Sequence, residues 1–373
     1  MSPNHSWLTA LAVVAIALSP ALPSAGAADL AHLEQQAMQA AVDRVAESVV
    51  RIQSVGGTAQ VEGVTLGKGP CTGLVVSPDG LIVSSRFNFA RQPTSILVEL
   101  PEGGPLAARL LGTDTSRGLV LLKVDLPEGA AALTVPAVAP VEAAVPGAWA
   151  LAIGRALDVR ELNLSVGVVS AIQRIWGKAI QTDAKVSPSN YGGPLVDIHG
   201  RVLGLLVPLS PAREGDLAGS EWYDSGIGFA IPYAYIQKVL PRLRAGENLR
   251  PGFMGLSLRG DGNLFGIPPQ VQATHPDSPA ARAGLQVDDK ILAVDGMAVT
   301  NIAQLKYQIK PRFAGDQIRL TVLRKEEQRT HELTLAEESG IRWIEPRPEA
   351  KQQQQKKSPL PKPKKGRDPL DRI

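Results

Sequence analysis

Short strand patterns separated by turn signals constrain the fold of this chain more than any other feature. Runs of Val, Leu and Ile end repeatedly at Gly, Pro, Asp or Ser, and Pro-Asp-Gly at residues 78–80 marks a hairpin turn. The strand patterns lie at residues 49–52, 73–76, 81–83, 95–100, 107–110, 149–154 and 164–171. Short strands joined by many turns are typical of an all-β barrel or sandwich.

Length and composition agree with a globular chain of several domains. The 373 residues are enough for two or three domains. The hydrophobic share of 44% and the charged share of 20% allow a sizeable core. Aromatic residues make up only 4% of the chain, so we expect Val, Leu, Ile and Ala to supply most of the packing.

Residues 1–28 have the pattern of a secretory signal. An apolar run at residues 8–18 precedes Ala25-Gly26-Ala27, the small-x-small pattern of a cleavage site. The run is too short for a stable membrane span, and an uncleaved anchor is the alternative. Residues 29–50 then have apolar side chains at helical spacing, with Asp29 as the expected N-cap.

The single cysteine, Cys71, cannot form an intrachain disulfide. We expect it to be a small buried side chain. An intermolecular disulfide or a reactive thiol is the alternative. The sequence indicates no metal site and no cofactor.

Basic residues gather at the C-terminal end of the sequence. Residues 351–373 hold eight Lys or Arg and two Asp or Glu, a net charge of +6, so residues 1–350 sum to −3 against the total of +3. Residues 344–373 are rich in Gln, Pro and Lys, and we expect them to be disordered. Three roles are open for this basic tail: a solvated end, contact with anionic envelope surfaces, and binding of Asp371-Arg372-Ile373 to a groove in the same chain.

The sequence S-N-Y-G-G-P-L at residues 189–195 resembles the active-site loop of HtrA-type, trypsin-like serine proteases, which reads G-N-S-G-G-P-L. The resemblance places Tyr191 at the position of the nucleophilic serine. A phenol cannot replace a serine Oγ there, because it is bulkier and its oxygen lies several ångströms further from the backbone. Ser189 also replaces a glycine of the loop that stabilises the oxyanion.

The other two positions of the catalytic triad depart from the family as well. The strand G-L-I-V-S-S-R-F-N-F at residues 80–89 is similar to G-x-I-L-T-N-x-H-V-V, which puts Phe87 at the histidine position. The segment D-T-S-R-G-L-V-L-L-K-V at residues 114–124 is similar to D-x-x-x-D-L-A-V-L-K-V, which puts Gly118 at the aspartate position. A triad needs a nucleophile, a base and a carboxylate that orients the base, so the sequence predicts no intact triad.

Few other residues could take over catalysis. Only His199 among the five histidines lies close in sequence to the loop, and the turn that carries it is expected to point away from the cleft. Lys185 with Ser187 or Ser189 could form a Ser-Lys dyad, although solvated loop residues are the simpler interpretation. Phe87 and Tyr191 could fill a disused cleft or line a groove for extended peptides, and we favour the first.

The resemblance implies two packed six-stranded β-barrels in residues 29–248, followed by a PDZ domain in residues 251–336. The segment G-I-G-F-A-I-P at residues 226–232 matches the family at the end of the second barrel. In the PDZ region S-P-A-A-R-A-G-L at residues 278–285 matches a family helix. The segment at residues 288–296 matches G-D-x-I-x-x-V-N-G, except that Asp288 replaces Gly and Asp295 replaces Asn.

The PDZ resemblance implies a site for polypeptide segments or protein C-termini. In this mode a peptide adds a strand to a sheet edge, and backbone N–H groups hold its carboxylate. The corresponding loop consists of Phe253, Met254, Gly255 and Leu256. Leu305 and Ile309, on a helix expected at residues 301–310, either line the apolar pocket or face the domain core.

We therefore expect an exported HtrA-like pseudoprotease of the periplasm or cell envelope. It would bind peptides as an adaptor, a chaperone-like holder or a modulator of active HtrA relatives. A homo-oligomer is compatible with the sequence, and a specific nucleic-acid partner is not expected. The alternatives are an active serine-type endopeptidase with an unconventional site and a structural envelope protein.

Overall fold

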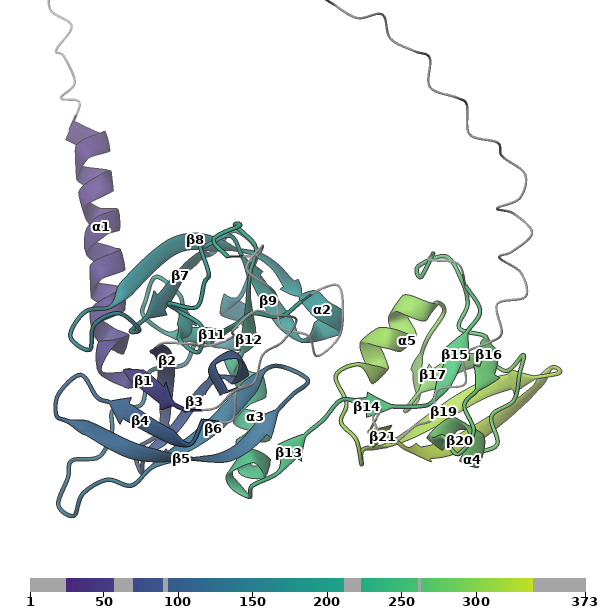
Figure 1. The fold of residues 1–373 in the computed structure, drawn as a ribbon. Helices are drawn as coiled ribbons and strands as arrows, with labels where there is room; N and C mark the ends of the chain where they lie inside the picture. The colour runs from purple at the N-terminus through teal and green to yellow at the C-terminus, as the bar shows by residue number, and fades with distance from the viewer. Residues whose placement is uncertain (1–24, 57–69, 90–92, 211–222, 261–262, 338–373) are drawn as a thin grey trace, which may run out of the picture.

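The computed structural model describes residues 25–56, 70–89, 93–210, 223–260 and 263–337. The chain folds into two adjacent β-barrels, with a smaller domain beside them that is formed by the C-terminal part (Figure 1). A helix, α1, projects from the barrels on the side away from the C-terminal domain. The expected signal at residues 1–28 and the tail at residues 344–373 lie largely or wholly outside the described residues.

The first barrel is made of six antiparallel strands. They are β1 (Val49–Val55), β2 (Cys71–Ser77), β3 (Leu81–Ser85), β4 (Ser95–Glu99), β5 (Pro105–Asp114) and β6 (Leu119–Val124). The order β5-β4-β1-β2-β3-β6 closes on itself because β5 also pairs with β6. A short strand after the second barrel, β13 (Asn248–Leu249), adds to β5 in parallel.

The second barrel also contains six strands. They are β7 (Trp149–Gly154), β8 (Asn163–Gln173), β9 (Ala179–Thr182), β10 (Pro194–Val196), β11 (Val202–Val207) and β12 (Gly228–Pro232). They close in the order β10-β11-β12-β9-β8-β7. The predicted pair of six-stranded barrels is thus confirmed. As expected from the composition, Val, Leu, Ile and Ala fill most of the barrel interiors.

Helices and 3-10 turns connect and flank the barrels. They are α1 (Ala25–Val45), the 3-10 turns η1 (Ala46–Ser48), η2 (Arg86–Phe89) and η3 (Val141–Ala143), α2 (Arg174–Gly177) and α3 (Tyr233–Arg244). The expected N-cap at Asp29 is wrong, because α1 already begins at Ala25 in an alanine-rich stretch of high helix propensity. No helix among the described residues is long and apolar enough to cross a bilayer.

The C-terminal domain contains short strands and two helices. Its elements are β14 (Gly252–Phe253), β15 (Leu256–Leu258), β16 (Val271–Thr274), α4 (Pro279–Arg282), β17 (Lys290–Val294), β18 (Met297–Ala298), α5 (Ile302–Ile309), β19 (Gln317–Arg324), β20 (Glu327–Thr334) and β21 (Ala336–Glu337). Ser278 and Asn301 cap α4 and α5 through side-chain hydrogen bonds. Asp288 and Asp295 have positive φ, a conformation that Asp tolerates better than most residues.

Arg117 joins the barrels to the C-terminal domain. Its guanidinium carbon lies 3.5 Å from the ring centroid of Tyr235 on α3 and 5.5 Å from that of Phe313, which follows α5. Its Nη2 donates a hydrogen bond of 3.2 Å to the carbonyl of Pro311. Arg242 on α3 contacts the Phe313 ring as well, with its guanidinium carbon 5.2 Å from the ring centroid.

A buried carboxylate holds Arg117 in place. Asp114 is fully buried and accepts hydrogen bonds from the Tyr235 hydroxyl at 2.7 Å and from the backbone N–H of Arg117 at 3.1 Å. Burial raises the pKa of Asp114, while the positive charge of Arg117 opposes that rise. The junction between the domains is therefore built from one continuous set of polar and aromatic contacts.

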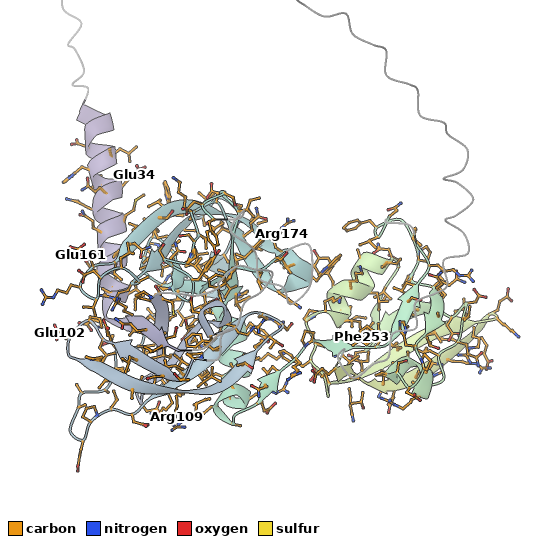
Figure 2. All side chains as sticks on the ribbon, in the orientation of Figure 1. Glu34, Glu102, Arg109, Glu161, Arg174 and Phe253 are labelled. Atoms are coloured by element: carbon orange, nitrogen blue, oxygen red, sulfur yellow. The ribbon has the colours of Figure 1, made fainter. Side chains whose placement is uncertain are left out.

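A second contact between the domains involves α2 and α5. The rings of Trp176 and Tyr307 lie edge to face with centroids 5.5 Å apart, and Lys306 Nζ lies 5.2 Å from the Trp176 ring. Ile175 and Trp176 have positive φ, which is strained for a β-branched or bulky residue. Figure 2 shows Arg174 at the side of the second barrel that faces the C-terminal domain.

Candidate functional site

The structure brings the three positions assigned to a catalytic triad together between the barrels. Phe87 lies in η2 directly after β3, and Tyr191 lies in the turn before β10. Their rings meet edge to face with centroids 5.4 Å apart. Gly118, between β5 and β6, accepts a hydrogen bond of 2.7 Å from the N–H of Arg86, next to Phe87. Phe87 thus lies beside Tyr191, and Gly118 is linked by one backbone hydrogen bond to the residue before Phe87.

Aromatic packing fills this part of the cleft. Phe87 is 3% exposed and Tyr191 is 2% exposed, and both belong to one hydrophobic cluster of the second barrel. The Tyr223 ring packs on Tyr191 from the other side, with centroids 6.1 Å apart. Aromatic pairs in this geometry stabilise a fold beyond the area that they bury.

Little space remains beside Tyr191. The hollow there has a volume of about 10 Å³, which is about the space of one water molecule. Its lining comes from the turn, from β11 and β12, and from the loop after β11: Val186, Tyr191, Val207, Pro208, Leu209, Ile227, Gly228 and Phe229. A substrate side chain does not fit into this volume without movement of the lining.

The backbone amides of residues 190–193 are engaged with the protein itself. The N–H groups of Asn190 and Tyr191 both donate to the carbonyl of Ser187, at 3.0 and 3.1 Å. The N–H of Gly192 donates to Leu206, and that of Gly193 donates to Asn190. An oxyanion hole requires amides that are free to bind the charge that develops on the substrate. The amides of residues 190–193 do not have that freedom in this conformation.

The retained glycines have a packing explanation. Gly192 has a φ of +87°, and a Cβ there would lie 2.2 Å from the carbonyl oxygen of Thr72. A Cβ on Gly193 would lie 2.0 Å from the carbonyl oxygen of Ile153. The close approach of the turn to β2 and β7 therefore requires both glycines, whether or not the loop is catalytic.

The Ser-Lys dyad considered from the sequence is not assembled. The Oγ atoms of Ser187 and Ser189 lie 2.9 Å apart, but the Lys185 side chain is exposed and makes no hydrogen bond or ion pair with any described residue. His199 is turned toward α1, where its carbonyl accepts a hydrogen bond of 3.1 Å from Arg44.

One Ser-Lys pair was missed by the sequence analysis. Lys178 Nζ donates a hydrogen bond of 2.9 Å to Ser116 Oγ. Both side chains are 2% exposed, so a substrate has no direct access to either atom. The two residues are 62 positions apart and share no motif, so no sequence signal connected them.

An apolar groove in the C-terminal domain has the volume of a binding site. It holds about 330 Å³ between the loop at residues 252–256 with β15 on one side and α5 on the other. Phe253, Met254, Gly255 and Leu256 line it, together with Leu305 and Ile309. Leu305 and Ile309 are 1% and 5% exposed and also belong to the domain core. They therefore line the groove and face the core at the same time.

The loop directs its carbonyls away from the groove. Met254 C=O accepts a hydrogen bond from Ala280 N–H, and Gly255 C=O accepts from Ser278 Oγ and His275 N–H. In a trans peptide the C=O and the next N–H point in opposite directions. The N–H of Gly255 is therefore directed away from α4, where a bound carboxylate could accept it.

The groove also has an open strand edge and a positive rim. Among the described residues β15 pairs with β16 alone, so its other edge has no partner strand. Lys306 and Lys310 on α5 contribute positive charge to the lining. Figure 2 shows Phe253 on the side of the C-terminal domain nearer to the barrels.

Family models match both parts of the chain. A trypsin-like peptidase domain model matches residues 71–205, and a PDZ domain model matches residues 252–335. The serine endoprotease DegS of Escherichia coli K12 is 30% identical over 322 residues, which cover 80% of this chain and 85% of DegS. The chain belongs to the HtrA/Deg family of trypsin-like peptidases with a PDZ domain.

Other relatives and solved structures agree with this membership. A probable periplasmic DegP-like serine endoprotease of Halomonas elongata is 31% identical over 71% of this chain; the match spans 56% of that relative. The chain thus spans a little over half the length of this DegP-like protein. A serine endoprotease structure from Yersinia pestis shares 28% identity with a TM-score of 0.59, covering 80% of this chain and 97% of that one. The HtrA-type protease AlgW with a tripeptide shares the fold, with a TM-score of 0.64 and 24% identity, covering 82% and 98%.

Proposed function

We propose that this HtrA/Deg-family chain binds polypeptide segments or protein C-termini through its PDZ groove and does not cleave them. The observation that carries the proposal is the edge-to-face packing of Phe87 on Tyr191 at the positions of the general base and nucleophile. Neither a phenyl ring nor a glycine can take up or orient a proton, and the hollow beside Tyr191 holds about 10 Å³.

The groove of the C-terminal domain supports the binding half of this proposal. It combines an open strand edge, a loop whose Gly255 N–H is directed away from α4, and two lysines in the lining. A peptide with an apolar last residue and a free carboxylate has the complementary chemistry. The periplasmic relatives and the signal-like residues 1–28 support a place in the periplasm or cell envelope.

A second candidate function is endoproteolysis at an unconventional site. The relatives favour it, since DegS and the DegP-like proteins are named serine endoproteases. It would require Tyr191 to leave its packed position and another serine to become the nucleophile. The buried Ser116 and the Ser187–Ser189 pair would have to be reached by substrate.

One set of measurements on the full chain separates the two functions. We expect no labelling by a serine-directed fluorophosphonate and no hydrolysis of unfolded casein. Labelling of one serine, with turnover that is lost when this serine is replaced by Ala, would establish the endopeptidase and contradict the main proposal.

The binding half has its own test. Fluorescence anisotropy with a library of peptides should find ligands with an apolar C-terminal residue, and amidation of the carboxylate should weaken binding at least tenfold. Leu258→Ser in the groove should weaken binding to a similar extent, whereas Leu157→Ser, at a side chain that is 82% exposed on the second barrel, should leave it unchanged. Equal affinity for free and amidated peptides would contradict recognition of the carboxylate.

A further inference from the structure

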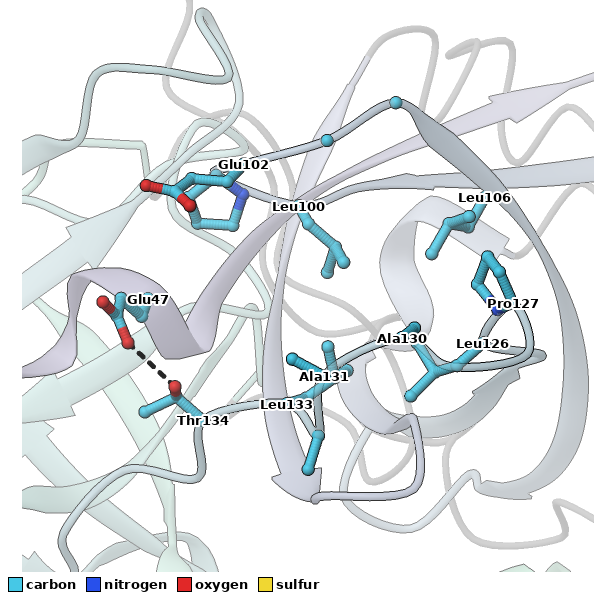
Figure 3. A pocket seen from close by; sticks show the side chains of 14 residues that line it. Glu47, Leu100, Glu102, Leu106, Leu126, Pro127, Ala130, Ala131, Leu133 and Thr134 are labelled. Carbon is cyan, nitrogen blue, oxygen red and sulfur yellow. Dashed lines mark hydrogen bonds between the residues drawn. The ribbon is translucent and has the colours of Figure 1, made fainter.

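A second apolar hollow lies on the first barrel, away from the C-terminal domain. It has a volume of about 400 Å³ and is formed by the loop between β4 and β5 and the segment that follows β6. Figure 3 shows the side chains of Leu100, Leu106, Leu126 and Leu133 directed into it. Figure 2 places Glu102, at its rim, on the far side of the barrels from the C-terminal domain.

Both charged residues that line this hollow are acidic. Glu47 and Glu102 line it, and Glu47 accepts a hydrogen bond of 2.8 Å from Thr134 (Figure 3). The two wall segments, residues 99–106 and 124–134, hold four acidic residues and no lysine or arginine. Two of the four are paired with arginines of neighbouring strands, Glu99 with Arg51 and Asp125 with Arg109. Glu102 and Glu128 are exposed and make no ion pair within the described structure. An occupant should therefore combine an apolar side chain with neighbouring positive charges.

The same chain contains a segment with this chemistry. Residues 356–365 read K-K-S-P-L-P-K-P-K-K, with five lysines and no acidic residue around the single leucine, Leu360. Proline-rich sequences of this type bind apolar surfaces at a low entropic cost, because proline restricts their backbone. The lysines complement the acidic rim, and the leucine with its flanking prolines complements the leucine- and alanine-lined interior.

The connecting chain is long enough to reach the hollow. From Glu337, the last described residue, to Leu360 there are 23 residues, which span about 70 Å at about 3.1 Å per residue in an extended conformation. A globular body of the size of the two barrels is about 45 Å across. Attachment to the same chain also makes binding of the segment intramolecular, so its effective concentration does not depend on the protein concentration.

We propose that the leucine-lined hollow of the first barrel binds the lysine- and proline-rich segment at residues 356–365 of the same chain. Leu360 enters the hollow, and the lysines pair with Glu102, Glu128 and Glu47 at its rim. Because these ion pairs are at the surface, binding weakens as the salt concentration rises. Bound in this way, the basic segment is withheld from anionic partners until salt or a competing ligand releases it.

Disulfide cross-linking of the full chain tests this proposal. Cys71 is fully buried, so cysteines introduced at the surface can be oxidised selectively. One variant carries Ala131→Cys at the hollow with Ser358→Cys in the segment. The matched control carries Gln237→Cys, an exposed position on α3 close to the C-terminal domain, with the same Ser358→Cys. Peptide mapping distinguishes disulfides within a chain from those between chains.

We expect the intrachain disulfide between Ala131→Cys and Ser358→Cys to form at least ten times faster than the disulfide between Gln237→Cys and Ser358→Cys in the control variant. The rate difference should disappear when Glu102→Lys and Glu128→Lys are added together, and also when Leu360→Ser is added. Oxidation at high salt concentration should remove it as well. Equal rates at the two positions would overturn the proposal. A disulfide that forms only between chains would overturn it as well, and would instead make a second copy the source of the segment. Preserved cross-linking after Leu360→Ser would contradict the role of the leucine.

Discussion

At the residue scale, Tyr191 and Phe87 contribute packing at a place where an active protease keeps polar groups. Both rings are almost completely buried and touch each other, and Tyr223 extends the contact. Filling the cleft with aromatic rings removes apolar area from water and thus stabilises the contact between the barrels. The same packing leaves the turn at residues 187–193 held by its own hydrogen bonds.

Truncation of Tyr191 should therefore destabilise the protein. We expect Tyr191→Ala to lower the free energy of unfolding by about 3–5 kcal/mol, as for other buried aromatic residues. Tyr191→Phe keeps the ring and should cost about 1 kcal/mol. Urea unfolding followed by circular dichroism gives both values, with Leu157→Ala, at a side chain that is 82% exposed, as the control. A loss below 1 kcal/mol for Tyr191→Ala would show that the ring is not a packing residue.

Cys71 gives a prediction on the pH dependence of stability. Burial raises the pKa of its thiol from 9.0 to about 12. In the unfolded chain the thiol loses its proton near pH 9, whereas the folded chain keeps it, so stability falls as pH rises above 9. Between pH 8 and pH 10 this group should cost the wild type about 1.4 kcal/mol.

The measurement compares the wild type with Cys71→Ala. Urea unfolding of both proteins at pH 8, 9 and 10 isolates the contribution of the thiol, because Lys and Tyr residues titrate in both. Between pH 8 and pH 10, the unfolding free energy of the wild type should fall by about 1.4 kcal/mol more than that of Cys71→Ala. A difference that is independent of pH would mean that the thiol has the same pKa in the folded and the unfolded chain.

At the scale of elements, most strands followed from local chemistry, whereas the start of α1 and the strained segments did not. The apolar runs predicted seven of the barrel strands, and the helix expected at residues 301–310 matches α5, because burial patterns act over a few residues. The left-handed stretch at Ile175 and Trp176 had no sequence signal. β-branched and aromatic residues avoid positive φ, so this conformation depends on contacts with residues far away in the sequence.

The contact between Trp176 and Tyr307 should be measurable as a coupling between α2 and α5. We expect a double-mutant cycle with Trp176→Ala and Tyr307→Ala to give a coupling energy of about 0.5–1.5 kcal/mol, because edge-to-face rings attract each other beyond their burial. Urea unfolding of the four proteins provides the cycle. Trp149→Ala with Tyr307→Ala serves as the control pair and should be additive. Additivity in the Trp176 cycle would mean that the two helices are not coupled through these rings.

At the scale of the whole molecule, the resemblance predicted two barrels and a PDZ domain, and the structure shows that architecture. It could not predict how the parts meet. Arg117 has no motif of its own, and its partners Tyr235, Pro311 and Phe313 lie more than a hundred positions along the chain. The filling of the cleft was expected from Phe87 and Tyr191, whereas the contribution of Tyr223 was not, because nothing in the sequence places it beside them.

The junction at Phe313 should make the barrels and the PDZ domain unfold together. The ring is 6% exposed and lies against Arg117 and Arg242 of the barrel part, so its loss removes the centre of the contact. In calorimetry we expect one transition for the wild type, with equal calorimetric and van't Hoff enthalpies, and two separate transitions for Phe313→Ala. Phe265→Ala, at a ring that is 74% exposed, should keep the single transition. If Phe313→Ala also unfolds in one step, the barrels and the PDZ domain are held together by contacts other than this ring, with the pair formed by Trp176 and Tyr307 as the next to remove.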